Sequence, residues 1–193
     1  MKELDISHKP SPYSTGDKIR RVLWGMVYSL FFRHSLRPLH RWRIFLLRCF
    51  GAKISPKARI SPKARITLPR NLVMDDYATI GDDAIIYSAA IITIGRQATV
   101  SQYSYLCSAT HDYEDAYNIL YAEPITIGEN AWVAADVFVG PGVTIGAGTV
   151  VGARSSVFKD LPEWKVCVGN PAKPIKDRVI TKDRSAEGST MHG

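Results

Sequence analysis

The chain has 193 residues, of which 46% are hydrophobic and 22% are charged, so it carries enough apolar material for one sizeable core. Its three cysteines, Cys49, Cys107 and Cys167, are scattered and form no C-x-x-C pair, which argues against a zinc ribbon or a redox motif. The net charge of +7 is uneven, because residues 1–53 hold 11 Lys or Arg against 3 Asp or Glu, whereas residues 54–193 hold 14 against 15.

The N-terminal part is predicted to be a basic, partly helical extension. One helix is expected from Asp17, acting as the N-terminal cap, to Phe32, and a second from His40 to Phe50, which ends before Gly51. The longest apolar stretch, Val22 to Phe32, is about half of the roughly 20 residues that a membrane-spanning helix needs, so no transmembrane segment is expected. The absence of a secretory signal pattern favours the cytoplasm.

Five arginines of this extension are interleaved with aromatic and aliphatic residues. Nucleic-acid binding finds no support, since no helix-turn-helix, zinc-finger or RNA-binding signature is present. A membrane-facing or anionic-substrate role fits the cluster better. The interpretation that we rank first is a helix that packs its apolar side on the main domain and leaves its arginines in solvent. The arginines are Arg33, Arg37, Arg41, Arg43 and Arg48.

A period of six residues dominates the rest of the chain. Its clearest run places aliphatic residues every sixth position from Ile127 to Val157, and a small residue follows each of the first five. Shifted registers repeat the pattern from Ile54 onward. The period suits short strands joined by sharp turns, where glycine would supply the turn conformations, in a coil whose aliphatic side chains point inward. Stacked coils would share one continuous core, since no single repeat can bury its apolar side chains alone.

The repeat stops at His111 and resumes at Ile125. The segment 112–124 is therefore predicted to leave the coil as a protruding loop. The expected organisation is a basic extension over 1–53, a repeat domain over 54–176 and a polar tail over 177–193 that is rich in small residues and expected to fray.

These repeats resemble the hexapeptide-repeat acyltransferases over about residues 54–176. The run 132–148 and the ending Gly169-Asn-Pro-Ala-Lys173 are specific matches, and segments 42–54 and 108–115 carry a narrower resemblance to colanic-acid-type exopolysaccharide acetyltransferases. The resemblance implies a mainly β fold, a left-handed parallel β-helix with an N-terminal helical segment and a protruding loop. It also implies a homotrimer with active sites between adjacent subunits.

His111 is the only histidine of the repeat region. One histidine cannot easily supply the metal site of the hexapeptide carbonic anhydrases, so no metal is expected. A neutral imidazole can accept the proton of an attacking hydroxyl, although a lone histidine could equally cap the loop through a backbone hydrogen bond. The resemblance favours a catalytic base, which would let the acceptor hydroxyl attack acetyl-CoA directly without an acyl-enzyme. Either a carboxylate of residues 112–115 or a backbone carbonyl could orient the ring.

The resemblance also supplies candidate binding residues, any of which could instead be packing residues or surface charges. Backbone groups and positive charge in the C-terminal coils are expected to hold acetyl-CoA, with a backbone amide near the thioester as the candidate oxyanion donor. The candidates for acetyl-CoA are Trp132, Ala134 and Ala135 at the thioester end, Ala153 and Lys159 along the arm, and Lys173 and Lys176 near the phosphates. The candidates for the acceptor are Tyr87, Ser88, Gln102, Tyr103 and Asp112.

The favoured function is an acetyl-CoA-dependent O-acetyltransferase that acts on a sugar hydroxyl in exopolysaccharide biosynthesis. The basic, aromatic extension suggests a lipid-linked acceptor and peripheral contact of residues 1–53 with the inner face of the membrane. Two alternatives stay open: the same chemistry on an amino sugar or an antibiotic, and a non-enzymatic β-helix scaffold. No nucleic-acid partner is expected.

Overall fold

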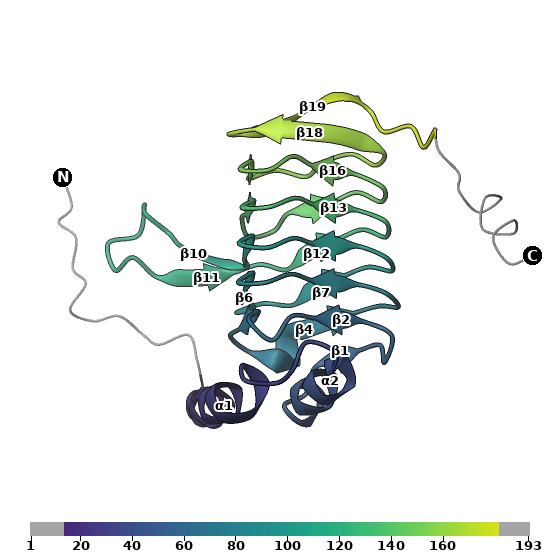
Figure 1. Ribbon diagram of the computed structural model, residues 1–193. Helices are drawn as coiled ribbons and strands as arrows, with labels where there is room; N and C mark the ends of the chain where they lie inside the picture. The colour runs from purple at the N-terminus through teal and green to yellow at the C-terminus, as the bar shows by residue number, and fades with distance from the viewer. Residues whose placement is uncertain (1–13, 182–193) are drawn as a thin grey trace, which may run out of the picture.

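The computed structural model describes residues 14–181, so the predictions for residues 1–13 and for the tail beyond residue 181 lie outside the described residues. A parallel β-helix makes up most of the molecule, and two helical segments lie beneath its N-terminal end (Figure 1). The predicted mainly β fold with an N-terminal helical segment is thereby confirmed. Within residues 14–181 no helix has the length and apolarity to cross a membrane.

Three parallel sheets form the walls of the β-helix, and the chain passes from face 1 to face 2 to face 3 in each coil. Face 1 consists of β1 (Lys53–Ile54), β4 (Leu72–Met74), β7 (Ile92–Ile94), β12 (Ile125–Ile127) and β15 (Thr144–Ile145). Face 2 consists of β2 (Arg59–Ile60), β5 (Thr79–Ile80), β8 (Thr99–Val100), β13 (Trp132–Val133), β16 (Val150–Val151), β18 (Lys165–Gly169) and the antiparallel edge strand β19 (Ala172–Asp177). Face 3 consists of β3 (Arg65–Ile66), β6 (Ile85–Tyr87), β9 (Tyr105–Cys107), β14 (Phe138–Val139) and β17 (Ser156–Val157).

The six-residue period places the core as predicted. Val133, Val139 and Ile145, which are successive aliphatic positions of the repeat, are fully buried. Because each strand pairs in register with the strands of the coils above and below, these side chains stack into one continuous apolar column. Burial of this column is the main stabilising contribution, at roughly 25 cal/mol per Å² of apolar surface.

Gly142 and Gly148, with φ of +74° and +67°, supply turn conformations as predicted, whereas the glycines that follow the aliphatic positions serve another purpose. A Cβ on Gly146 would lie 2.6 Å from the backbone nitrogen of Glu163 in the next coil, so glycine is required there for the close approach of two backbones. The left-handed conformations at the corners fall mostly on other residues, such as Tyr103 with φ 62° and Asp136 with φ 59°.

The first helical segment begins earlier than predicted. Helix α1 (Thr15–Val27) is capped by Ser14, whose side chain accepts the N–H of Asp17 at 3.1 Å. Asp17 is therefore not the cap, and its carboxylate instead pairs with Arg70 at 2.9 Å. The helix continues into the π-helical turn η1 (Tyr28–Phe32), and a short 3₁₀ turn, η2 (Pro69–Asn71), follows β3.

The second helix, α2 (His40–Cys49), ends as predicted before Gly51, whose φ is +91°. Its apolar residues Ile44 and Leu47 pack into the core. The expectation of solvated arginines is wrong for Arg43, which is fully buried. Its guanidinium donates to the carbonyls of three residues and to the hydroxyl of a fourth, so hydrogen bonds compensate for the loss of water. The acceptors are Ile60 O at 2.7 Å, Leu36 O at 2.8 Å, Arg37 O at 2.6 Å and Ser35 Oγ at 2.9 Å.

The interruption of the repeat forms an antiparallel hairpin of β10 (Ala109–His111) and β11 (Leu120–Ala122). It leaves the coil between β9 on face 3 and β12 on face 1, and Figure 1 shows it projecting sideways from the middle of the β-helix. The protrusion thus begins a few residues before position 112, and His111 ends its first strand.

Candidate active site

His111 is exposed at the end of β10, and its ring is held by the backbone. The Nδ1 atom lies 2.7 Å from the carbonyl oxygen of Asn118 on the other side of the hairpin. Because a carbonyl can only accept, Nδ1 carries the proton of the neutral ring and Nε2 keeps its lone pair. Asn118 has φ 48°, a left-handed conformation that asparagine tolerates better than most residues. A ring in this tautomer can act as a base through Nε2.

The acidic residues of the hairpin serve its turn. One oxygen of Asp112 accepts the N–H of Glu114 at 2.9 Å, and one oxygen of Asp115 accepts the N–H of Tyr117 at 2.7 Å. The sequence allowed either a carboxylate or a backbone carbonyl to orient the His111 ring. In the structure the group in contact with the ring is the backbone carbonyl of Asn118.

Two of the predicted acceptor-binding residues, Tyr87 and Ser88, lie near the base of the hairpin. The carbonyl of Tyr87 accepts the N–H of Ser108 at 3.1 Å, at the point where β9 gives way to the hairpin. Ser88 is fully buried, and its hydroxyl accepts the N–H of Leu68 at 3.1 Å and donates to the Leu68 carbonyl at 2.9 Å. This geometry gives Ser88 a role in joining successive coils rather than the predicted contact with an acceptor.

Most predicted acetyl-CoA residues lie elsewhere, on face 2 and its corner with face 3. The indole of Trp132 is exposed on β13 and donates to the hydroxyl of Ser101 at 2.9 Å. Lys173 and Lys176 are exposed on β19 at the edge of the same face, and Ala153 is exposed just beyond β16. Since the hairpin leaves between faces 3 and 1, one chain does not bring His111 and Trp132 together.

The backbone amides of Ala134 and Ala135 are the candidate donors to an oxyanion, and they differ in whether they already donate a hydrogen bond. The Ala134 amide donates to the carbonyl of Val151 at 3.0 Å and is thereby committed to the stack of coils. The amide of Ala135 makes no hydrogen bond to any of residues 14–181. Lys159, the remaining predicted contact, is exposed after β17, on the side from which the hairpin projects.

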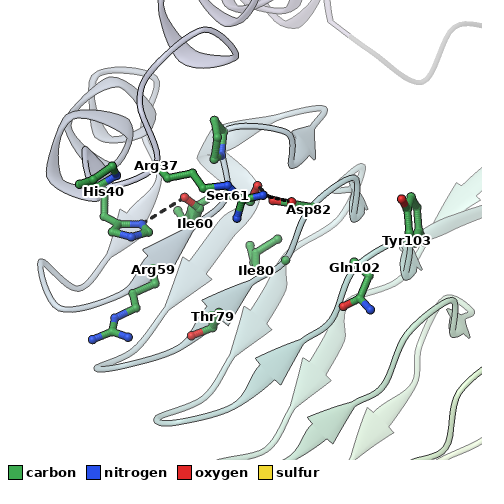
Figure 2. A pocket seen from close by; sticks show the side chains of 13 residues that line it. Arg37, His40, Arg59, Ile60, Ser61, Thr79, Ile80, Asp82, Gln102 and Tyr103 are labelled. Carbon is green, nitrogen blue, oxygen red and sulfur yellow. Dashed lines mark hydrogen bonds and ion pairs between the residues drawn. The ribbon is translucent and has the colours of Figure 1, made fainter.

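A cavity of about 870 Å³ opens on face 2 beside the N-terminal end of α2 (Figure 2). It contains two of the predicted acceptor residues, Gln102 and Tyr103. It also contains Arg59 and Asp82, which sequence reasoning missed because their positions in the repeat are those of ordinary outward-facing residues. The lining residues are Arg37, Pro38, His40, Arg59, Ile60, Ser61, Pro62, Thr79, Ile80, Gly81, Asp82, Gln102 and Tyr103.

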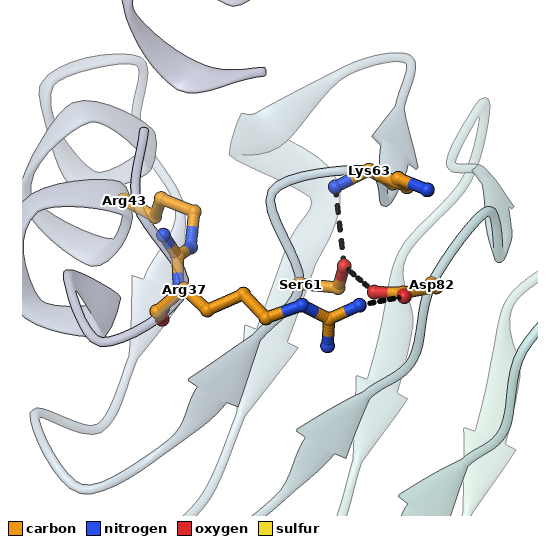
Figure 3. A network of polar contacts seen from close by, with 5 residues as sticks. All are labelled: Arg37, Arg43, Ser61, Lys63 and Asp82. Atoms are coloured by element: carbon orange, nitrogen blue, oxygen red, sulfur yellow. Dashed lines mark hydrogen bonds and ion pairs between the residues drawn. The ribbon is translucent and has the colours of Figure 1, made fainter. Parts of the chain in front are cut away.

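A polar network fixes one wall of this cavity (Figure 3). Arg37 Nη2 lies 2.5 Å from Asp82 Oδ2, and the Ser61 hydroxyl donates to the other oxygen of Asp82 while accepting the N–H of Lys63 at 3.1 Å. The hydrogen bond from Ser61, followed by the hydrogen bond and the charge of Arg37, holds the pKa of Asp82 below its usual value against the opposing effect of burial. Asp82 is therefore charged at neutral pH, and the wall offers both donors and acceptors.

His40, near Arg37 at the start of α2, contributes a neutral ring to the same cavity. Burial, followed by the charge of Arg43, lowers the pKa of His40. Arg43 Nη2 lies 3.1 Å from His40 Nδ1, and since a guanidinium can only donate, Nδ1 accepts and the proton resides on Nε2. The 3.3 Å approach of Nδ1 to Ile60 O is then not a hydrogen bond, and that oxygen is satisfied by Arg43 Nε. Among residues 14–181 no group of three or more His, Cys, Asp or Glu side chains could hold a metal ion.

Comparison with known proteins agrees with this architecture. Residues 124–159 match the family model described as bacterial transferase hexapeptide (six repeats). A protein of Escherichia coli (strain K12), which carries the provisional name colanic acid biosynthesis acetyltransferase WcaF, is 50% identical over 182 residues that cover 94% of this chain and 100% of its own length.

Two solved structures extend the comparison to three dimensions. A maltose O-acetyltransferase from Clostridium difficile 630 has a TM-score of 0.77 and 27% identity over 85% of this chain and 89% of its own. A hexapeptide-repeat acetyltransferase from Vibrio cholerae O1 biovar eltor, complexed with acetyl coenzyme A, has a TM-score of 0.76 and 26% identity over 88% of this chain and 93% of its own. The chain is therefore an acetyltransferase that belongs to the bacterial hexapeptide-repeat family, with the left-handed parallel β-helix of that family.

Proposed function

We propose that the protein transfers the acetyl group of acetyl-CoA to a hydroxyl of an exopolysaccharide sugar, with His111 as the general base. The observation that carries this proposal is the Nδ1 contact with the Asn118 carbonyl, which in the neutral ring directs the lone pair to Nε2, on an exposed hairpin. The relative in Escherichia coli, named for colanic acid biosynthesis, supports a polysaccharide acceptor.

The reaction balances without a covalent enzyme intermediate. His111 Nε2 takes the proton of the acceptor hydroxyl as the oxygen attacks the thioester carbon. The carbon–sulfur bond then breaks, the coenzyme A thiolate leaves, and the imidazolium returns the proton to sulfur. The products are an O-acetyl ester and free coenzyme A. The Ala135 amide, which has no partner among residues 14–181, is our candidate donor to the oxyanion.

We further propose that the complete site forms between two subunits of a homotrimer. His111 and Trp132 project from different parts of the β-helix, so a site that needs both must combine the hairpin of one copy with face 2 of the next. A head-to-tail contact of this kind closes into a ring when it repeats with three-fold symmetry.

The cavity that contains Gln102 and Tyr103 is our candidate for the acceptor site. It adjoins the predicted thioester end, since Ser101, the partner of the Trp132 indole, directly precedes Gln102. Its guanidinium, carboxylate, amide and phenol groups suit a hydroxyl-rich glycan, and a lipid-linked glycan is included in the proposal. We place the reaction in the cytoplasm, where acetyl-CoA is available.

Subunit complementation tests the proposal sharply. His111→Ala and Trp132→Ala should each be nearly inactive with acetyl-CoA and the acceptor glycan. After refolding or co-expression at equal amounts, about one quarter of the inter-subunit sites would pair an intact His111 with an intact Trp132, so roughly a quarter of wild-type activity should return. Mixtures that stay inactive would contradict a shared site. Wild-type turnover by His111→Ala would contradict the assignment of the base, and transfer to amino sugars alone would contradict O-acetylation.

A further inference from the structure

Within residues 14–181, helix α1 packs on the β-helix through one side. The indole N–H of Trp24, which is buried, donates to the Ile66 carbonyl at 2.6 Å, and the buried Asp17 pairs with Arg70. These contacts fix the rotation of the helix about its own axis. The opposite side of α1 is therefore turned away from the coils, at the end of the molecule shown at the bottom of Figure 1.

That outward side is apolar. Ile19, Val22, Leu23 and Met26 are 57, 65, 49 and 57% exposed. They follow the i, i+3, i+4, i+7 spacing, so at about 100° per residue they occupy an arc of about 100° on the helix surface. Such a stripe ordinarily faces a protein core, yet this helix already has its core contact on the other side.

Further exposed apolar side chains lie on η1, which continues α1, and on α2. Phe31 and Trp42 are both exposed, and the Trp42 indole donates to the Phe31 carbonyl at 3.2 Å. Phe45 stacks on Trp42 with ring centroids 5.8 Å apart and is 55% exposed. We call this surface, formed by the α1 stripe with Phe31, Trp42 and Phe45, the helical end face.

The segment that forms the helical end face is basic. Residues 14–53 contain nine Lys or Arg, of which Arg43 is buried and Arg37 pairs with Asp82, and their single acidic residue, Asp17, is neutralised by Arg70. On α1 itself, Lys18 and Arg20 flank the two edges of the apolar stripe, where long side chains can reach the headgroups while the stripe is immersed. A second copy docked on the same face would bring two basic surfaces together, which opposes self-association.

We propose that the helical end face docks on the surface of an anionic phospholipid bilayer. An amphipathic helix that has a basic polar side and an aromatic and aliphatic apolar side lies in the membrane interface, and each Lys or Arg near an anionic leaflet strengthens that binding. In the trimer of the proposed function, three such faces would point in one direction and bind together. Arg37, which lines the candidate acceptor cavity, lies just before α2 at this end of the molecule. If the proposed function holds, docking would therefore bring the cavity toward lipid-linked glycans.

Vesicle co-sedimentation of the full-length protein tests this inference. Wild-type protein should bind phosphatidylcholine vesicles containing 30% phosphatidylglycerol, should bind pure phosphatidylcholine at least tenfold more weakly, and should be released by 0.5 M salt. Val22→Ser combined with Met26→Ser should lower binding to the anionic vesicles at least tenfold. Lys18→Gln combined with Arg20→Gln should weaken binding to the anionic vesicles more than binding to the neutral ones, so the ratio of the two affinities should fall.

The matched control removes the same amount of apolar surface elsewhere. Val179 and Ile180, which are 72 and 62% exposed beyond β19, are each replaced by Ser, and this variant should bind vesicles as the wild type does. All variants should keep the wild-type melting temperature and the wild-type rate on a water-soluble acceptor, so loss of docking is separable from failure of the catalytic proposal. Unchanged vesicle binding by V22S/M26S would overturn the inference. A smaller oligomer for V22S/M26S in light scattering would also overturn it, because the face would then be a contact between copies of the chain.

Discussion

The contact that orients His111 depends on a single backbone conformation. Asn118 has φ 48°, and its carbonyl oxygen lies 2.7 Å from His111 Nδ1. We therefore compare Asn118→Val with Asn118→Gly. Valine disfavours the left-handed region, whereas glycine adopts it freely, and neither substitution removes the carbonyl itself.

The expected size of the effect follows from the lost hydrogen bond. The left-handed conformation costs a β-branched residue about 1–2 kcal/mol, so the backbone of the valine variant should relax away from it and carry the carbonyl with it. The lost hydrogen bond is worth about 0.5–1.5 kcal/mol. Because about 1.4 kcal/mol of barrier is a factor of ten in rate, kcat of Asn118→Val should fall about 2- to 12-fold. Asn118→Gly should retain the kcat of the wild type.

The assay is the release of the coenzyme A thiol at saturating acetyl-CoA and acceptor, with KM measured for both substrates. His111→Ala sets the lower limit, since loss of a general base costs roughly 10²- to 10⁴-fold. KM should change little in Asn118→Val, because the carbonyl acts only on the ring. Equal activity of the valine and glycine variants, whether both high or both low, would refute this account of how His111 is oriented.

Three further predictions concern stability. Val139→Asp should abolish folding, because an unpaired carboxylate would replace a fully buried side chain at a cost of several kcal/mol, whereas Val179→Asp at an exposed site should keep the wild-type circular dichroism spectrum. Arg43→Met should destabilise the fold by about 3 kcal/mol and lower the melting temperature by about 10 °C, since Ile60 O loses its buried donor, and a shift below 2 °C would contradict this. The lowered pKa of His40 means that the unfolded chain binds more protons just below pH 6.5, so stability should fall on acidification from about pH 7 to pH 5. In denaturant titrations, the free energy of unfolding of His40→Gln should decrease less than that of the wild type over this pH range. An equal decrease in the two proteins would contradict the prediction.

The packing interpretation of the basic extension holds for α2 but not for the exposed stripe of α1. Ile44 and Leu47 of α2 pack on the core as the packing interpretation requires. The stripe from Ile19 to Met26 on α1 does not, because Trp24 already occupies the inward side of that helix. Apolar residues on two sides of one helix cannot be assigned to core or solvent from their spacing alone.

The sequence by itself determined the coil, its core and the position of the hairpin, because a six-residue period allows only one set of side chains, such as Val139 and Ile145, to face inward in every coil. The tertiary structure alone decided which contacts hold the site. No periodic pattern records the Asn118 carbonyl at His111, because that contact depends on an unusual backbone conformation. Nor does it record the Arg37–Asp82 pair or the buried hydrogen bonds of Ser88 and Arg43, because these contacts join residues that lie far apart in the sequence. Periodicity reports which face of a strand a residue occupies, whereas hydrogen bonds depend on where other segments pass in space.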